Sequence, residues 1–113
     1  MIKIYHNPRC SKSRQGLSIL EESGKAFETI KYLENDLTSV EIQDILIKLD
    51  IKPIDLIRKN EAIWKSDFKG KELTDNDLIA AMVNHPKLIE RPIVINGDNA
   101  VIGRPPEAIK EII

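Results

Sequence analysis

The first 33 residues alternate between two kinds of hydrophobic pattern. A run of β-forming side chains at residues 2–5 ends in a turn at Asn7-Pro8, and residues 26–33 repeat the β character. Between these runs, small or apolar residues recur at helical spacing, and Gly24 stands where a left-handed C-terminal cap is wanted. The recurring residues are Ser13, Leu17 and Leu20. A strand, a helix and a strand at this spacing predict a right-handed βαβ unit, in which the two strands run parallel.

The last part of the chain returns to a β pattern. Residues 93–95 and 100–102 flank Asn96-Gly97-Asp98-Asn99, whose composition favours a tight hairpin turn. Pro105-Pro106 can then open a final helix, because proline is well tolerated in a first helical turn. This part of the chain therefore predicts two antiparallel strands followed by a helix.

The middle of the chain has helical character. Thr38 with Glu41 fits a capping box before an apolar stripe, and Thr74 can cap a later helix that Pro86 stops. The remaining notable side chains of this region are interpreted as packing residues. They are Trp64, Phe68 and His85.

One domain can account for all 113 residues. The order of strand, helix, strand, helical insert, strand, strand and helix predicts an α/β, thioredoxin-like fold. Its four-stranded mixed sheet would carry a helical insertion between strands 2 and 3. We expect the thioredoxin-like core at residues 1–33 and 87–113, with the helical insert at residues 34–86.

Composition narrows the class of partner. The 17 Lys and Arg nearly balance the 18 Asp and Glu, which gives no general attraction for nucleic acid or an anionic membrane. No apolar run approaches the ~20 residues of a membrane-spanning helix, and MIKIYHN lacks the apolar region of a signal peptide. The single cysteine and the two distant histidines fit none of the usual zinc spacings. We therefore expect a cytoplasmic monomer that binds no metal, nucleic acid or membrane.

The only cysteine, Cys10, lies in the segment HNPRCSKSR between the first strand and the first helix. If the helix starts near residue 11, unpaired N–H groups and the positive end of the helix dipole face the thiol and lower its pKa. His6 can orient the thiolate, and Ser13 can donate a hydrogen bond. Nearby cations would add to this effect: Arg9, Lys12 and Arg14. We interpret Cys10 as a reactive nucleophile, because buried structural cysteines seldom stand among so many polar neighbours.

The spacing around Cys10 separates it from two known kinds of cysteine chemistry. Residue 13 is Ser, so the chain has no Cys-x-x-Cys pair, and an external thiol must complete any redox reaction. Residue 16 is Gly, whereas cysteine phosphatases place an arginine at that spacing from the nucleophile. Phosphatase chemistry is therefore weakly supported.

Arg91 and Arg104 stand equally far from the centre of the predicted hairpin turn, between Gly97 and Asp98. In a symmetric hairpin they would face each other at its open end. Like charges opposed across strands are destabilising unless an anion binds between them. Two solvated surface arginines are the alternative, with neighbouring glutamates as partners.

Five segments closely resemble the glutaredoxin-dependent arsenate reductase family, in the same order along nearly the whole chain. They are HNPRCSKSR, KYLE at 31–34, RKNE at 58–61, HPKLIERPIV at 85–94 and IGRPPE at 102–107. The resemblance implies a thioredoxin-like fold with a helical insertion. It also implies an oxidoreductase of arsenic detoxification that reduces arsenate to arsenite, with glutathione as co-substrate, glutaredoxin as partner and no bound cofactor.

The resemblance also implies roles for individual residues. Cys10 would attack arsenate, while His6 and Ser13 favour the thiolate, and Pro92 would be a cis proline beside the active site. Three arginines would hold the oxyanion: Arg58, Arg91 and Arg104.

Two alternatives stay open at this point. Regulators similar to the Spx proteins share the fold and bind RNA polymerase, although Ser13 and the complete arginine set favour the enzyme. A related thiol oxidoreductase could instead act on another oxyanion or on a glutathione adduct. Active arsenate reductases often carry Gly-Thr-Ser after the cysteine, where this chain has Ser11-Lys12-Ser13.

Overall fold

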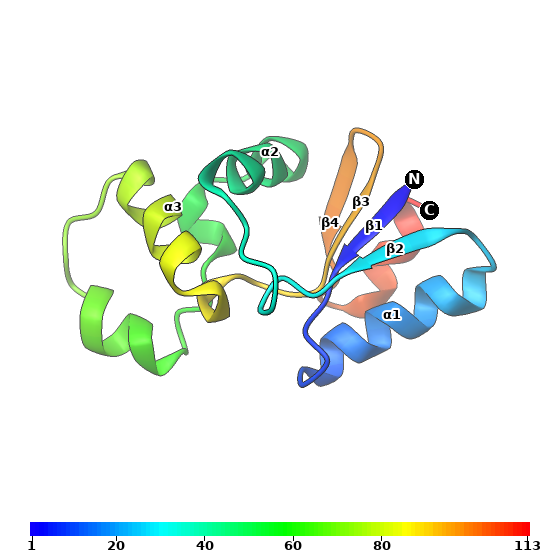
Figure 1. The fold of residues 1–113 in the computed structure, drawn as a ribbon, viewed down its shortest axis with the longest axis horizontal. Helices are drawn as coiled ribbons and strands as arrows, with labels where there is room; N and C mark the ends of the chain where they lie inside the picture. The colour runs from blue at the N-terminus through cyan, green and yellow to red at the C-terminus, as the bar shows by residue number, and fades with distance from the viewer. The chain divides into compact units, whose positions relative to one another are not determined.

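Four short strands form one mixed sheet in the computed structural model, which describes residues 1–113 (Figure 1). β1 (Ile2–Tyr5) pairs in parallel with β2 (Phe27–Ile30) and antiparallel with β3 (Ile93–Asn96). β3 in turn pairs antiparallel with β4 (Asn99–Ile102), giving the strand order β2-β1-β3-β4. The predicted thioredoxin-like arrangement is therefore confirmed.

Two helical segments accompany the sheet, and their apolar residues join it in one core. α1 (Ser11–Ser23) connects β1 to β2 and ends at Gly24, whose φ of 71° is the predicted left-handed cap. The last segment, η4 (Pro106–Glu111), is a 3₁₀ helix and packs against α1. The buried core that they share with the sheet consists of Ile2, Ile4, Leu20, Val94 and Ile109.

The second strand is shorter than the predicted span of residues 26–33. β2 ends at Ile30 because the chain turns immediately afterwards. The N–H groups of Glu34 and Asn35 both donate to the carbonyl of Lys31, at 3.0 and 3.1 Å. Those local hydrogen bonds replace a continued ladder with β1.

The C-terminal hairpin has the predicted symmetric register. Asn96 pairs with Asn99 around the two-residue turn, and Ile93 pairs with Ile102 at the other end. Gly97 has a φ of 64°, a conformation that glycine adopts without steric cost. The open end of the hairpin therefore lies next to residues 91 and 104.

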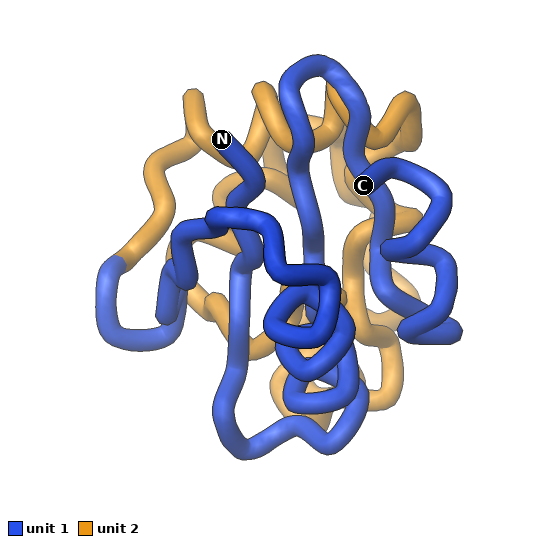
Figure 2. Tube along the Cα trace, turned by 90° about the vertical axis from the view of Figure 1, so that its right-hand side faces the viewer, with its two compact units in different colours: residues 1–35, 91–113 blue, residues 36–90 orange.

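The chain divides into two compact units, which Figure 2 colours blue and orange. Unit 1 comprises residues 1–35 and 91–113, and unit 2 comprises residues 36–90. The prediction placed the core at 1–33 and 87–113, so the structural boundaries fall a few residues later at both junctions.

Unit 2 is built from short helices. They are α2 (Ser39–Leu49), η1 (Pro53–Leu56), the π-helix η2 (Trp64–Phe68), α3 (Asp75–Asn84) and η3 (Pro86–Leu88). Thr38 forms the predicted capping box with Glu41, and Thr74 forms a second one with Asp77. The N-terminal ends of both helices are therefore specified locally by the sequence.

Aromatic packing organises one side of unit 2. The rings of Trp64 and Phe68 stack with centroids 5.8 Å apart, and His85 meets Phe68 edge-on at 5.8 Å. This confirms their interpretation as packing residues. None of the helices combines the length and the apolar character that spanning a lipid bilayer requires.

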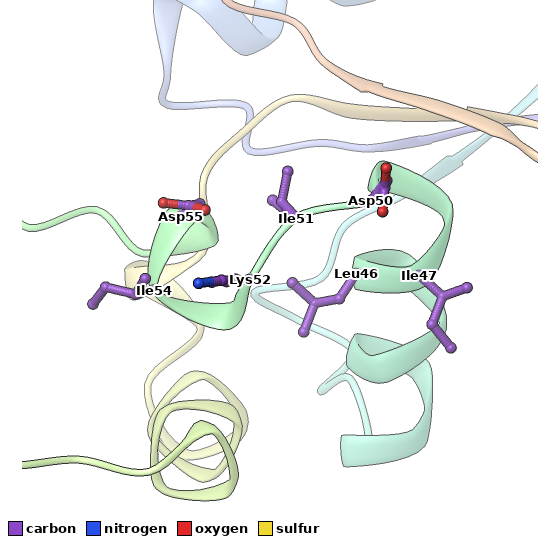
Figure 3. A pocket seen from close by; sticks show the side chains of 7 residues that line it. All are labelled: Leu46, Ile47, Asp50, Ile51, Lys52, Ile54 and Asp55. Carbon is purple, nitrogen blue, oxygen red and sulfur yellow. The ribbon is translucent and has the colours of Figure 1, made fainter.

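An open depression lies beside the C-terminal end of α2 (Figure 3). It contains none of the predicted site residues. Its lining is Leu46, Ile47, Asp50, Ile51, Lys52, Ile54 and Asp55.

Candidate active site

Cys10 is the N-cap residue of α1. Its φ and ψ of −96° and 124° are extended, while its carbonyl already accepts the first helical hydrogen bond, from the Arg14 N–H at 3.0 Å. The thiol therefore lies at the end of the helix where backbone N–H groups have no helical partner. The prediction of a helix starting at residue 11 is confirmed.

The loop before Cys10 is held by hydrogen bonds from both of its ends. The carbonyl of Asn7 accepts from the Cys10 N–H at 3.0 Å, and its side-chain Oδ1 accepts from the Arg9 N–H at 3.0 Å. Arg14 Nη1 donates to the carbonyl of Pro8 at 2.8 Å. The sequence predicted a turn at Asn7-Pro8, and the structure adds that the Asn7 side chain itself hydrogen-bonds the loop backbone.

His6 and Ser13 form a buried pair beneath this loop. The Nδ1 atom of His6 lies 2.7 Å from the Ser13 Oγ, which also accepts the Asn7 N–H at 2.9 Å. Burial lowers the pKa of His6, and the charges of Lys31 and Arg14 lower it further against the opposing effect of Ser13. The imidazole is therefore neutral near pH 7.

The pKa of the Cys10 thiol is lowered from its ordinary value. Partial burial raises it, but hydrogen bonding from the backbone of Ser13, the guanidinium of Arg91 and the backbone of Lys12 together outweigh that effect. The thiolate is thus favoured by donors that come from the helix start and from the hairpin.

Arg91 and Arg104 meet at the open end of the hairpin, as predicted. The Nε of Arg104 donates to the Arg91 carbonyl at 2.9 Å, and its Nη2 lies 3.5 Å from the Cys10 Sγ. Arg91 is buried with 8% exposure, whereas Arg104 is exposed. The two guanidinium groups therefore flank the thiol in different environments.

The backbone at the hairpin entrance has two cis peptide bonds. Arg91–Pro92 is cis, as the resemblance implied for Pro92. Arg104–Pro105 is also cis, which sequence reasoning did not anticipate.

Arg58 lies in unit 2, where two carboxylates accompany it. Its Nε is 3.4 Å from Glu61 Oε1, and its Nη1 is 4.0 Å from Glu90 Oε2. The backbone N–H of Arg58 donates to the Leu88 carbonyl at 2.7 Å, next to a bridge between Ile57 and Ile89. The membership of Arg58 in an anion site remains a prediction.

The arrangement in unit 1 can perform nucleophilic chemistry on an anion. A sulfur whose pKa is lowered provides the nucleophile, and neighbouring guanidinium groups provide donors that suit a tetrahedral oxyanion.

Comparison with known proteins agrees with this chemistry. Residues 5–112 match the ArsC family. The arsenate reductase of Haemophilus influenzae is 44% identical over 112 residues, covering 97% of each chain. That of Neisseria meningitidis serogroup A is 43% identical over 114 residues, covering 99% of this chain and 97% of the relative.

A solved structure extends the likeness to three dimensions. The arsenate reductase from Vibrio cholerae superposes with a TM-score of 0.94 at 43% identity, covering 99% of this chain and 97% of that one. The chain therefore belongs to the ArsC family, the family of arsenate reductases.

Proposed function

We propose that the chain reduces arsenate to arsenite, with Cys10 as its only catalytic nucleophile. The observation that carries the proposal is the contact of 3.5 Å between Arg104 Nη2 and the Cys10 Sγ at the start of α1. This contact supports the proposal because the Arg104 guanidinium, which would bind an oxyanion, lies beside a sulfur whose pKa is lowered.

The first step forms a bond between sulfur and arsenic. The Cys10 thiolate attacks As(V), the sulfur–arsenic bond forms, and one arsenate oxygen leaves as hydroxide or water. Arg91 and Arg104 would hold the remaining oxygens and offset their negative charge. Arsenic is still As(V) after this step.

The following steps use thiols from solution, because the chain has no second cysteine. Glutathione attacks arsenic and displaces a second oxygen as water. Glutaredoxin then attacks the sulfur of glutathione, the arsenic–glutathione bond breaks, and its electron pair reduces As(V) to As(III). Water finally releases arsenite from Cys10, which returns to the thiol. The two external thiols leave as a mixed disulfide and supply both electrons.

Three further residues would support this chemistry. Arg58 would be the third oxyanion donor, held by Glu61 and Glu90. The pair of His6 and Ser13 would keep the loop of Cys10 in place, because Ser13 bonds both to His6 and to the loop backbone.

The proposal includes a cellular setting. The enzyme would act as a cytoplasmic monomer without a bound cofactor, in arsenic detoxification. A reducing cytoplasm keeps the lone thiol free, and it supplies glutathione and glutaredoxin.

A coupled assay with arsenate, glutathione and glutaredoxin tests the function. We expect turnover by the intact chain, none by Cys10→Ser, and loss of turnover when glutaredoxin is omitted. Absence of turnover by the intact chain would remove arsenate as the substrate, and the same assay with other oxyanions would then identify a replacement.

A further inference from the structure

Two glycines, Gly16 and Gly103, lie against the same proline ring. A Cβ placed on Gly16 would lie 2.8 Å from Pro92 Cγ and 2.9 Å from Ile109 Cδ1. A Cβ on Gly103 would lie 2.7 Å from the same Pro92 Cγ and 3.1 Å from the same Ile109 Cδ1. Both glycines are buried, so neither site opens onto solvent where a side chain could turn away.

The two neighbours of these glycines differ in how they can respond to an added atom. The Cδ1 of Ile109 is the end of a flexible side chain, and a rotation can move it aside. The Cγ of Pro92 belongs to a ring closed onto the backbone, so beyond a change of ring pucker it moves only together with the peptide on either side. A methyl group on either glycine would therefore press against the Pro92 ring and shift its backbone by whatever the ring pucker does not absorb.

The Pro92 backbone is joined directly to the candidate active site. Pro92 follows Arg91, and its carbonyl accepts the Gly103 N–H at 2.8 Å. Arg104, the next residue, donates from Nε to the Arg91 carbonyl at 2.9 Å. Gly16 lies on α1, close after Ser13 and the Cys10 cap. The Pro92 ring thus packs against α1, which carries the thiol at its start, and against the segment that leads to Arg104, while Pro92 itself follows Arg91.

We propose that Gly16 and Gly103 are positioning residues. Because they lack side chains, Pro92 packs closely against both, and this packing holds Arg91 and Arg104 beside the Cys10 thiol. The inference rests on the proposed function only in taking Cys10 as the reactive thiol. Its test uses a neutral alkylating reagent, so it gives an answer whether or not the chain reduces arsenate.

The test measures iodoacetamide alkylation of Cys10 against pH in Gly16→Ala and Gly103→Ala. We expect the apparent pKa of the thiol to rise in both, with a roughly three- to tenfold slower reaction below that pKa, because the rate follows the thiolate fraction. Arsenate should also protect the thiol less well, with a several-fold higher concentration needed for half-protection. Helix propensity alone predicts that Gly16→Ala stabilises α1, so it gives no reason for slower alkylation.

Two matched variants separate positioning from a general loss of stability. Ile109→Val removes the Cδ1 atom that both glycines approach, without placing anything against Pro92. It should lower the melting temperature while leaving the alkylation profile unchanged. Ser18→Ala changes an exposed residue of α1 and should behave like the unaltered protein.

Folded glycine variants with unchanged alkylation profiles and unchanged protection would overturn the proposal. If neither variant folds, nuclear Overhauser contacts in the unaltered protein decide instead. Contacts from the Cα protons of both glycines to the Pro92 ring protons support the proposed packing, and their absence contradicts it.

Discussion

At the scale of single residues, the site depends on the groups that lower the pKa of the Cys10 thiol. Burial alone would raise the pKa of the thiol, and donors from the helix start and from Arg91 reverse that effect. Much of this was predictable, because a lone cysteine before a helix with polar neighbours is a recognisable pattern. The turn at Asn7-Pro8 was also predicted, but the hydrogen bond of the Asn7 side chain and the close contact between His6 and Ser13 were not, because they depend on how the loop folds back on α1.

Arg91→Ala should raise the pKa of the Cys10 thiol, because both the hydrogen bond and the charge of Arg91 favour the thiolate. We expect the alkylation rate near pH 6 to fall severalfold, and the rate at high pH, where all variants are ionised, to stay the same. Arg91→Lys keeps the charge but loses the planar guanidinium group, so its alkylation rate near pH 6 should lie between those of the unaltered protein and Arg91→Ala. An unshifted profile in Arg91→Ala would contradict the assignment.

His6 gives the fold a defined sensitivity to acid. Its pKa is lowered in the folded chain, so the unfolded chain binds more protons as the pH falls through about 6.5. Stability is then complete above that pH and decreases below it, until the folded chain also protonates. Urea unfolding from pH 7.5 to pH 5 should show this decrease, and His6→Gln should flatten it. An equal decrease in the variant would assign the acid sensitivity to other groups.

At the scale of elements, local signals predicted those boundaries that local hydrogen bonds specify. The capping box of Thr38, the Gly24 cap and the turn at Gly97 were all identified correctly. The end of β2 was placed too late, because the turn after Lys31 begins with Tyr32 and Leu33, whose side chains favour a strand, and its turn-forming residue Asn35 comes only at its end. The π-helix over Trp64–Phe68 has no known sequence signature of comparable strength.

Thr38→Ala should destabilise unit 2 without affecting the thiol. Loss of an N-cap hydroxyl costs about 1 kcal/mol of unfolding free energy, and Thr38→Ser should restore most of it. Chemical denaturation measures the change, while Cys10 alkylation in native buffer serves as the second readout. A change in the alkylation profile would show that the cap influences the site after all.

At the scale of the whole molecule, strand pairing creates the site from distant segments. β1 leads into Cys10, and β3 begins just after Arg91; because these strands are antiparallel, Tyr5 pairs with Ile93 at the same end of the sheet. The hairpin pattern predicted that the two arginines meet each other. It did not place them beside the cysteine, since a hairpin does not specify which other strand it joins.

Arg58 tests the other unit of the molecule. Arg58 is assigned to the anion site only by the resemblance to the arsenate reductases. If Arg58 binds the oxyanion, Arg58→Ala should raise the KM for arsenate by roughly tenfold or more. This follows because a hydrogen bond to a charged group contributes about 1.5–3 kcal/mol, and about 1.4 kcal/mol corresponds to tenfold. The alkylation profile of Cys10 should not change, and exposed Lys59→Ala provides the control. An unchanged KM would remove Arg58 from the anion site.

The double engagement of Arg104 has one more consequence. Its Nε donates to the Arg91 carbonyl while its Nη2 faces the sulfur, so one rigid planar group fixes the distance between the hairpin and the thiol. An ammonium group carries all its donors on a single nitrogen, so a lysine here cannot reproduce two donors held apart in one plane. A lysine here would keep the positive charge but lose the fixed spacing between the two donors. Residue 104 therefore contributes geometry as well as charge.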